Sequence, residues 1–334
     1  MELNECLIEW YNANKRPLPF REKRDPYAIW VSEIMAQQTR IDSMIPYYHR
    51  WMEKWPTIES LAKAELDDVL QVWQGLGYYN RARKLHEGAK TVVETYSGKL
   101  PADIEELKKI PGIGFYTAGA IGSIAFGLRA PAVDGNVLRV TTRICQMDAD
   151  ITKKTTVDQV YQIVYDWMQN SDASSFTQGL MELGALICTP KNPSCLFCPL
   201  NHFCKSYAAG TQLDYPIKKA AKKPVELNLK TYLIDDGDSH ILLSEDWSDG
   251  LMVGLLRLPQ FAEKKKELEK AEFVEKRKHV FSHRIWNMDC YRMTDSEIKL
   301  ENTRWIDLDE LDSLAIVTAH RKWLEEWRKN HDKN

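Results

Sequence analysis

A glycine-rich break between two helical stretches constrains the fold more than any other feature. Residues 110–116 read Ile-Pro-Gly-Ile-Gly-Phe-Tyr. Pro111 ends the first helix, while Gly112 and Gly114 allow the positive φ and close backbone approach of a tight turn. The next helix is predicted to begin near Phe115, and its free N–H groups form a cradle for one phosphate. The alternative is a plain corner between two core helices.

Composition sets the size and class of the protein. Its 334 residues, 44% hydrophobic and 28% charged, indicate two globular domains. A net charge of −3 means that any DNA-binding surface has to concentrate its positive charge locally. The N-terminus does not resemble a signal peptide, and no apolar run approaches the length of about 18 residues that spans a membrane. We therefore expect no membrane, reduced thiols and a cytoplasmic, nucleoid-associated bacterial protein.

Residues 7–210 follow a helical pattern almost throughout. Within residues 29–39, helical spacing places Trp30, Glu33 and Gln37 on one face. Apolar neighbours would desolvate Glu33 and raise its pKa, as a proton donor working near neutral pH requires. A solvated or paired helix glutamate is the alternative.

A second carboxylate follows the hairpin. Asp134, in Val-Asp-Gly-Asn-Val, is placed to cap a helix that runs to about Gln146, and capping alone could explain it. A helix N-terminus lowers a carboxylate pKa, so we expect Asp134 to stay ionised where Glu33 is protonated. Such an acid and anion pair is typical of glycoside chemistry.

A turn between residues 75 and 79 separates a helix at 66–74 from a basic helix start. Its sequence is Gly-Leu-Gly-Tyr-Tyr, and aromatic side chains at such a turn can wedge between bases. Arg81, Arg83 and Lys84 follow, facing either phosphates or solvent.

Four cysteines gather within seventeen residues, with six, two and five residues between them: Cys188, Cys195, Cys198 and Cys204. Soft ligands at this density indicate a metal site. An iron–sulfur cluster, a structural zinc ion and unliganded thiols are the three interpretations.

The hydrophobic pattern changes after a basic, proline-flanked linker at residues 214–224. Alternating patterns predict strands from Val225 to Ile234, at 241–243 and within 280–291. Helices are predicted at 262–273 and 319–329, so the second domain is expected to be α+β.

Together these motifs resemble the MutY family of adenine DNA glycosylases. The resemblance implies a mostly α helix-hairpin-helix glycosylase domain at 1–213 with a cluster loop at 188–204, and a Nudix-like α+β domain at 225–334. It also implies a [4Fe-4S] cluster on the four cysteines. The expected activity is removal of adenine mispaired with 8-oxoguanine or guanine in double-stranded DNA, by a monomer.

The family pattern assigns roles to matching residues. Glu33 matches the acid that protonates adenine at N7, and Asp134 the carboxylate that stabilises the oxocarbenium sugar. Tyr116 and Asn136 match positions that line the pocket. In the related endonuclease III branch a lysine at the position of Tyr116 forms a Schiff base that cleaves the strand, so we expect a monofunctional enzyme here.

Further matches concern the duplex. Gln38 and Tyr78 match residues that wedge beside 8-oxoguanine while adenine is flipped. The predicted DNA-binding set is Gln38, Thr39, Leu76, Tyr78, Gly112 and Gly114. The loop expected to inspect 8-oxoguanine contains His279, Phe281, Ser282 and His283, and an ordinary polar β-hairpin is its alternative.

Two features limit the second domain. Residues 254–259 read Gly-Leu-Leu-Arg-Leu-Pro and keep the family pattern only in part. Residues 263–272 lack the Arg-Glu-x-x-Glu-Glu helix that binds magnesium in Nudix hydrolases, so this domain is expected to recognise and not to hydrolyse. An endonuclease III-like glycosylase with lyase activity and a non-catalytic DNA-damage or redox sensor are the rival functions.

Overall fold

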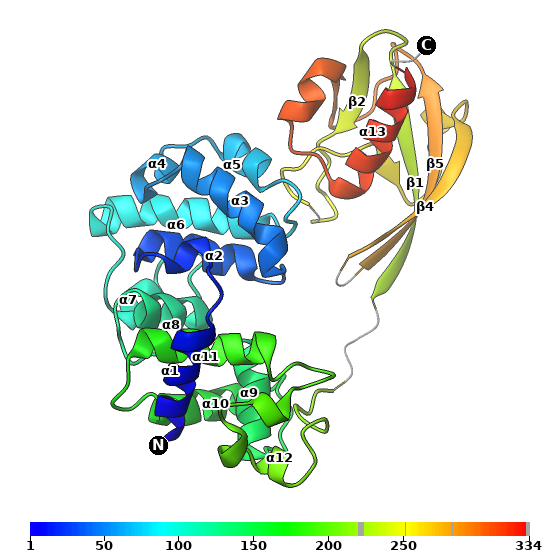
Figure 1. The fold of residues 1–334 in the computed structure, drawn as a ribbon. Helices are drawn as coiled ribbons and strands as arrows, with labels where there is room; N and C mark the ends of the chain where they lie inside the picture. The colour runs from blue at the N-terminus through cyan, green and yellow to red at the C-terminus, as the bar shows by residue number, and fades with distance from the viewer. Residues whose placement is uncertain (220–223, 251, 282–283, 332–334) are drawn as a thin grey trace. The chain divides into compact units, whose positions relative to one another are not determined.

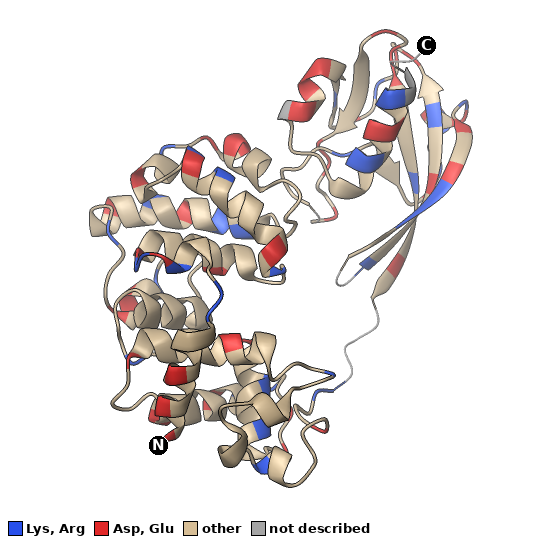
Figure 2. Cartoon of the chain, in the orientation of Figure 1, with Lys and Arg blue, Asp and Glu red and all other residues tan. Residues whose placement is uncertain are grey.

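The computed structural model describes residues 1–219, 224–250, 252–281 and 284–331 (Figure 1). The chain forms two compact units, one of residues 1–66 with 80–220 and the other of residues 67–79 with 221–334. Lys and Arg are interspersed with Asp and Glu in both units (Figure 2). Within the described residues, no helix combines the length and apolar character needed to cross a membrane.

The first unit is helical, as predicted. Its longer helices are α1 (Leu3–Asn14), α2 (Pro26–Ala36), α3 (Ile41–Lys54), α6 (Asn80–Tyr96), α8 (Phe115–Ile124), α9 (Gly135–Cys145), α10 (Lys154–Trp167) and α11 (Ala173–Leu186). Shorter helices are α4 (Ile58–Ala62), α7 (Ile104–Leu107) and α12 (Lys205–Ala208), with 3₁₀ turns at Pro19–Arg21, Cys195–Phe197 and Asn201–Phe203.

Capping residues fix where the helices that carry the site begin. Asp25 accepts a hydrogen bond from the Tyr27 N–H, and Pro26 stands at the first position of α2. Asp134 caps α9 in the same way. Helices α1, α9, α10 and α11 then pack around one apolar core that includes Leu7 and Phe176, both 0% exposed. Helix α8 packs against both α2 and α11, and α11 packs against α9, so packed helices connect the elements that carry Glu33, Tyr116 and Asp134.

The second unit contains a six-stranded sheet. Its strands are β1 (Val225–Asp235), β2 (His240–Ser244), β3 (Gln260–Phe261), β4 (Glu272–Val280), β5 (Arg284–Thr294) and β6 (Thr303–Asp307). The order is β4-β5-β1-β2-β6, with β3 paired to β1. Strands β1 and β5 are parallel, in register from Val225 with Arg284 to Asp235 with Thr294. This unit also includes α13 (Thr318–His331), and residues 67–79 contribute most of α5 (Leu66–Trp73).

The predicted helix at 262–273 is wrong, whereas the predicted C-terminal helix is confirmed as α13. Only a 3₁₀ turn, Lys266–Leu268, forms there, and β4 begins at Glu272. The run of Lys and Glu favours helix by propensity. Leu268 and Ala271 instead pack against the core of the sheet beside Tyr232. The last residues of the segment, from Glu272, pair with β5 as part of β4. Tertiary packing thus overrides a weak local preference.

Candidate active site

A short hydrogen bond joins α2 to α8. The Tyr116 hydroxyl donates to Oε2 of Glu33 at 2.5 Å. Burial raises the pKa of Glu33 from 4.5 to about 7, although the bond from Tyr116 and the charge of Arg21 act in the opposite direction. The carboxyl group is therefore available as a proton donor near neutral pH, as the sequence predicted.

Asp134 caps α9 with both of its carboxylate oxygens engaged. Oδ1 accepts from the Val137 N–H at 2.7 Å, and Oδ2 accepts from the Asn136 amide at 2.8 Å. The cap was predicted, but the expected lowering of its pKa is wrong. Burial raises the pKa of Asp134 and outweighs these hydrogen bonds and the charge of Arg139. A capping aspartate can be predicted from the sequence. How deeply its carboxylate is buried depends on the helices that pack around it.

The two carboxyl groups and the phenol form one electrostatic unit. The charge of Asp134 raises the pKa of Glu33 and, with Glu33, that of Tyr116. Two partly buried carboxyl groups that would both be negative when ionised repel each other, which favours a state in which one keeps its proton. Such a site can donate a proton from one carboxyl group and offer negative charge from the other.

The glycine hairpin leads directly into α8. Gly112 has a φ of 83°, and a Cβ there would lie 3.0 Å from Cβ of Lys84. Gly114 is the N-cap of α8, and a Cβ there would meet nothing within 4 Å. The backbone at Gly114 is therefore open to a ligand, in front of the positive end of α8. This geometry suits the predicted phosphate contact.

The predicted wedge residues lie at two turns. Gln38 and Thr39 follow the end of α2, where Gln38 has a φ of 58°. Leu76 and Tyr78 belong to the second unit: Leu76 is buried, while Tyr78 is 44% exposed with a φ of 51°.

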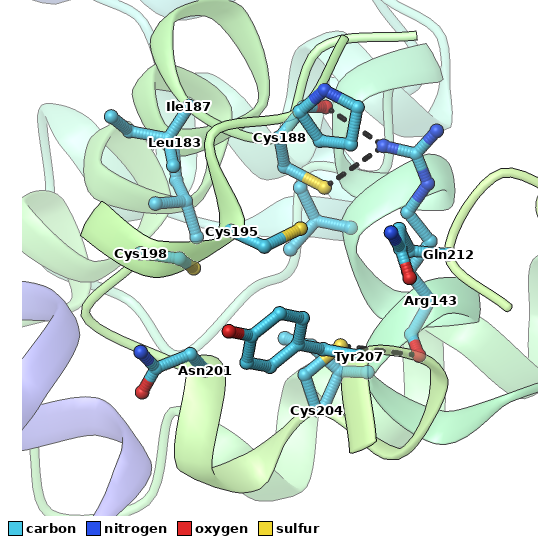
Figure 3. A pocket seen from close by; sticks show the side chains of 13 residues that line it. Arg143, Leu183, Ile187, Cys188, Cys195, Cys198, Asn201, Cys204, Tyr207 and Gln212 are labelled. Carbon is cyan, nitrogen blue, oxygen red and sulfur yellow. Dashed lines mark hydrogen bonds between the residues drawn. The ribbon is translucent and has the colours of Figure 1, made fainter. Parts of the chain in front are cut away.

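The four predicted ligand cysteines line one pocket, together with apolar side chains and the Arg143 guanidinium. Their sulfur atoms face a common hollow (Figure 3). All four are free thiols, and the pKa of Cys198 is raised to about 12, mainly by burial. Among the residues described, no three His, Cys, Asp or Glu side chains are arranged to hold a single metal ion. Four soft donors around one hollow fit a cluster in which each thiolate binds its own iron.

Two arginines that the sequence analysis did not single out bind Cys188, and one of them, Arg139, also links the pocket to Asp134 through Asn136. Arg139 Nη2 donates to Oδ1 of Asn136 at 2.8 Å, and its Nε donates to the Cys188 carbonyl at 2.7 Å. Arg143, 2% exposed, donates to Sγ of Cys188 at 3.3 Å. The spacing of 136, 139 and 143 along one helix face was the available signal.

A buried ion pair beside the site was also missed. Glu182 accepts from Nε of Arg16 at 2.8 Å and from Nη2 of Arg21 at 2.9 Å. Burial opposes ionisation of Glu182, but these partners prevail and hold its pKa at about 2. Arg21 Nη1 is buried and has no hydrogen-bond partner among the described residues. The charge of Arg21 also lowers the pKa of Glu33, so this ion pair acts electrostatically on the site.

The predicted 8-oxoguanine loop lies partly outside the described residues, because Ser282 and His283 do. His279 and Phe281 are described, with ring centroids 4.5 Å apart. Phe281 in turn contacts the buried Trp286 edge to face at 4.8 Å. The described flanks of the loop are thus anchored to the core of the second unit.

Comparison with family models separates the chain into two recognisable parts. Residues 31–164 match the HhH-GPD superfamily of base excision DNA repair proteins. Residues 231–326 match the NUDIX domain. Glu33, Tyr116 and Asp134 all fall within the first match.

Similar structures and sequences extend over more of the chain. A thermostable thymine-DNA glycosylase is 27% identical, with a TM-score of 0.56, and the match covers 62% of this chain and 95% of that one. An endonuclease III bound non-covalently to DNA is 25% identical, with a TM-score of 0.52, over 64% and 100% of the two chains.

Full-length relatives share one activity. The adenine DNA glycosylase of Buchnera aphidicola subsp. Schizaphis graminum is 34% identical over 96% of this chain and 97% of its own length. That of Rattus norvegicus is 32% identical over 95% and 76%. With both domains matched and relatives similar over nearly the whole chain, the chain belongs to the adenine DNA glycosylases of base-excision repair.

Proposed function

We propose that this glycosylase removes adenine mispaired with 8-oxoguanine, or with guanine, from double-stranded DNA and leaves the abasic strand uncut. The observation that carries the proposal is the state of Glu33. Its pKa is about 7, it accepts a hydrogen bond from Tyr116, and it lies close enough to Asp134 for their charges to interact. A base that leaves as a poor anion needs protonation, and Glu33 has a proton to give near neutral pH.

The chemistry divides between the two carboxyl groups. Glu33 donates its proton to N7 of a flipped adenine, so the C1′–N9 electron pair departs with a neutral base. The sugar becomes an oxocarbenium ion, and Asp134 supplies negative charge, held in place by the Asn136 amide at 2.8 Å. A carboxylate oxygen of Asp134 then bonds to C1′, and water, which gives its proton to the Glu33 carboxylate, displaces that oxygen, so the two displacements give retention at C1′. Tyr116 orients Glu33 throughout.

The strand stays intact because Tyr116 occupies the position where a lysine forms the Schiff base of the lyase branch. An endonuclease III-like glycosylase and lyase is the second candidate, since endonuclease III is among the similar structures. Tyr116 and the Nudix-like second domain both count against it.

Duplex binding is assigned to the glycine hairpin of the first unit and to Gln38 and Tyr78, and mispair inspection to residues 279–283 of the second unit. Two similar structures are endonuclease III–DNA complexes, which supports a duplex ligand. The hairpin at Gly112 and Gly114 grips a phosphate, and Gln38 and Tyr78 wedge beside 8-oxoguanine. The loop of residues 279–283 then reads the N7–H and O8 edge that guanine lacks, and the protein acts as a monomer.

The pocket of Cys188, Cys195, Cys198 and Cys204 holds a [4Fe-4S] cluster in this proposal. Because each thiolate binds a different iron, its ligands stand farther apart than those of one zinc ion. A bound cluster would tie residues 188–204 together through its cysteine ligands, and Arg139 donates to the carbonyl of one of them, Cys188.

Single-turnover adenine release tests the proposal. The substrates are duplexes with one adenine opposite 8-oxoguanine, guanine or thymine, and alkali is withheld from half of each sample. We expect release opposite 8-oxoguanine and guanine, with strand scission only after alkali. Glu33→Gln should bind the duplex without releasing base. Scission without alkali would favour the lyase, and binding without release by the wild type would favour the sensor.

Selectivity is tested separately. The double variant Ser282→Ala with His283→Ala should lower the ratio of rates opposite 8-oxoguanine and guanine, because the hydroxyl that can both donate and accept is lost. An unchanged ratio would remove this loop from recognition.

A further inference from the structure

Helix α2, which carries Glu33, ends in a strained turn. The Thr39 N–H donates to the Ala36 carbonyl at 3.1 Å. Between them Gln37 has φ −57° and ψ 114°, and Gln38 has φ 58°. These are the dihedral angles of a type II turn with Gln37 and Gln38 at its centre. Its second central position favours glycine, so a glutamine there is held against its own preference.

Arg81 supplies the restraint. It is the second residue of α6 (Asn80–Tyr96), and its Nη1 donates to the carbonyls of Ile34 at 2.9 Å and Met35 at 3.0 Å. The same nitrogen donates to the carbonyl of Gln37, and Nη2 lies 3.4 Å from Oγ1 of Thr39.

The charge of Arg81 acts on two helix ends, the N-terminus of α6 and the C-terminus of α2. A cation in the first turn of α6 is unfavourable for that helix, whereas a cation at the C-terminus of α2 is favourable. The last carbonyls of α2 have no partner within the helix, and this guanidinium supplies donors for them. Its hydrogen bonds to Ile34, Met35 and Gln37 therefore stabilise the C-terminal end of α2.

The carbonyl of Gln37 decides which turn forms. Type I and type II turns differ by rotation of the central peptide, which carries ψ of the first central residue from about −30° to about 120° and φ of the second from about −90° to about 80°. The oxygen that turns over is that of Gln37, the one Arg81 holds. With that oxygen released, Gln38 can return to negative φ, and its side chain then leaves the backbone in another direction.

We propose that Arg81 is a positioning residue that fixes the peptide between Gln37 and Gln38 in the type II orientation and so aims the Gln38 side chain at the duplex. This inference rests on the proposed function, because it takes Gln38 as a wedge. Tyr78 stands three residues before Arg81 in the sequence.

A double-mutant cycle tests the coupling. In Arg81→Lys the single ammonium cannot match the planar fork of the guanidinium. Adenine release opposite 8-oxoguanine should slow about tenfold because the wedge is misplaced. Gln38→Ala should also slow release, and the double variant should be no slower than the slower single variant. Multiplying losses, or full activity of Arg81→Lys, would overturn the proposal.

Two further variants sharpen the result. Gln38→Asn in the Arg81→Lys background should recover much of the rate, because asparagine tolerates positive φ and keeps the amide. Arg50→Lys is the matched control: Arg50 is exposed on α3 and stacks on Tyr47, so release should stay at the wild-type rate.

A measurement independent of activity accompanies these rates. Amide hydrogen exchange of residues 36–40 should speed up in Arg81→Lys and return toward the wild-type value in Arg81→Lys with Gln38→Asn. Unchanged exchange in Arg81→Lys would overturn the role of Arg81. If the wild-type enzyme releases no adenine, the proposed function is contradicted. The hydrogen-exchange result for Arg81→Lys then tests the role of Arg81 by itself.

Discussion

The backbone of Gly184 passes so close to Asn136 that a Cβ atom on Gly184 would lie 2.6 Å from Cβ of Asn136. Real Cβ atoms do not approach at this distance, so any side chain at 184 has to push Asn136 away. Asn136 is the residue whose amide donates to Asp134. Close packing of α11 on α9 therefore sets the direction of the Asp134 carboxylate.

Gly184→Ala is expected to lower adenine release about tenfold by displacing Asn136, and to cost about 1–3 kcal/mol of stability through overpacking. Gly179→Ala is the control on the same helix, because its Cβ would lie 3.1 Å from Cβ of Tyr11, away from the carboxylates. Thermal unfolding and single-turnover rates separate the two effects. Equal activity losses in both variants would mean that general destabilisation, not Asn136, is responsible.

The pH dependence of base release should follow Glu33. With a pKa of about 7, its acid form is present below that pH and is lost above it, so the rate should fall about tenfold per pH unit on the alkaline side. Tyr116→Phe removes a hydrogen bond that lowers this pKa, so the alkaline limb should move to higher pH. A limb that stays in place, or moves to lower pH, would assign it to another group.

Asp134→Asn separates capping from charge. Asparagine caps helices as well as aspartate does, so the Val137 N–H keeps its acceptor and α9 should remain, while the Asn136 amide loses the acceptor it has in Oδ2. The negative charge is lost, and adenine release should fall about a hundredfold or more. Circular dichroism and single-turnover rates measure the two outcomes. An active Asp134→Asn enzyme would restrict Asp134 to a structural role.

Cysteine substitution tests the metal site. Cys198→Ser should reduce bound iron and visible absorption and lower thermal stability, because Cys198 lines the shared pocket. Cys145→Ser is the control, since Cys145 is a half-buried free thiol on α9 outside the set that lines the pocket. Stoichiometric zinc in place of iron in the wild type would contradict the cluster.

Features determined by local sequence were predictable. Helical spacing placed Glu33 among apolar neighbours and gave the direction of its pKa shift. Glycines and a proline located the hairpin before α8, and Asp134 marked the start of α9. Each of these depends on residues within about one helical turn, where sequence patterns are informative.

Features determined by long-range packing were not predictable. The pKa of Asp134 moved opposite to expectation because burial comes from distant helices. Residues 262–273 form no helix, because Leu268 and Ala271 join the core cluster of the sheet. Arg81 reads as a surface cation in sequence, and only the fold brings it to the end of α2.

The parallel pairing of β1 with β5 has a mechanical consequence. Val225, the first residue of β1, is in register with Arg284, the first residue of β5. Tension applied along β1 from residues before Val225 would load this ladder in shear, so that many backbone hydrogen bonds resist together. The sheet can therefore bear tension applied at Val225 without separating one hydrogen bond at a time, and β4 would move together with β5, to which it is paired.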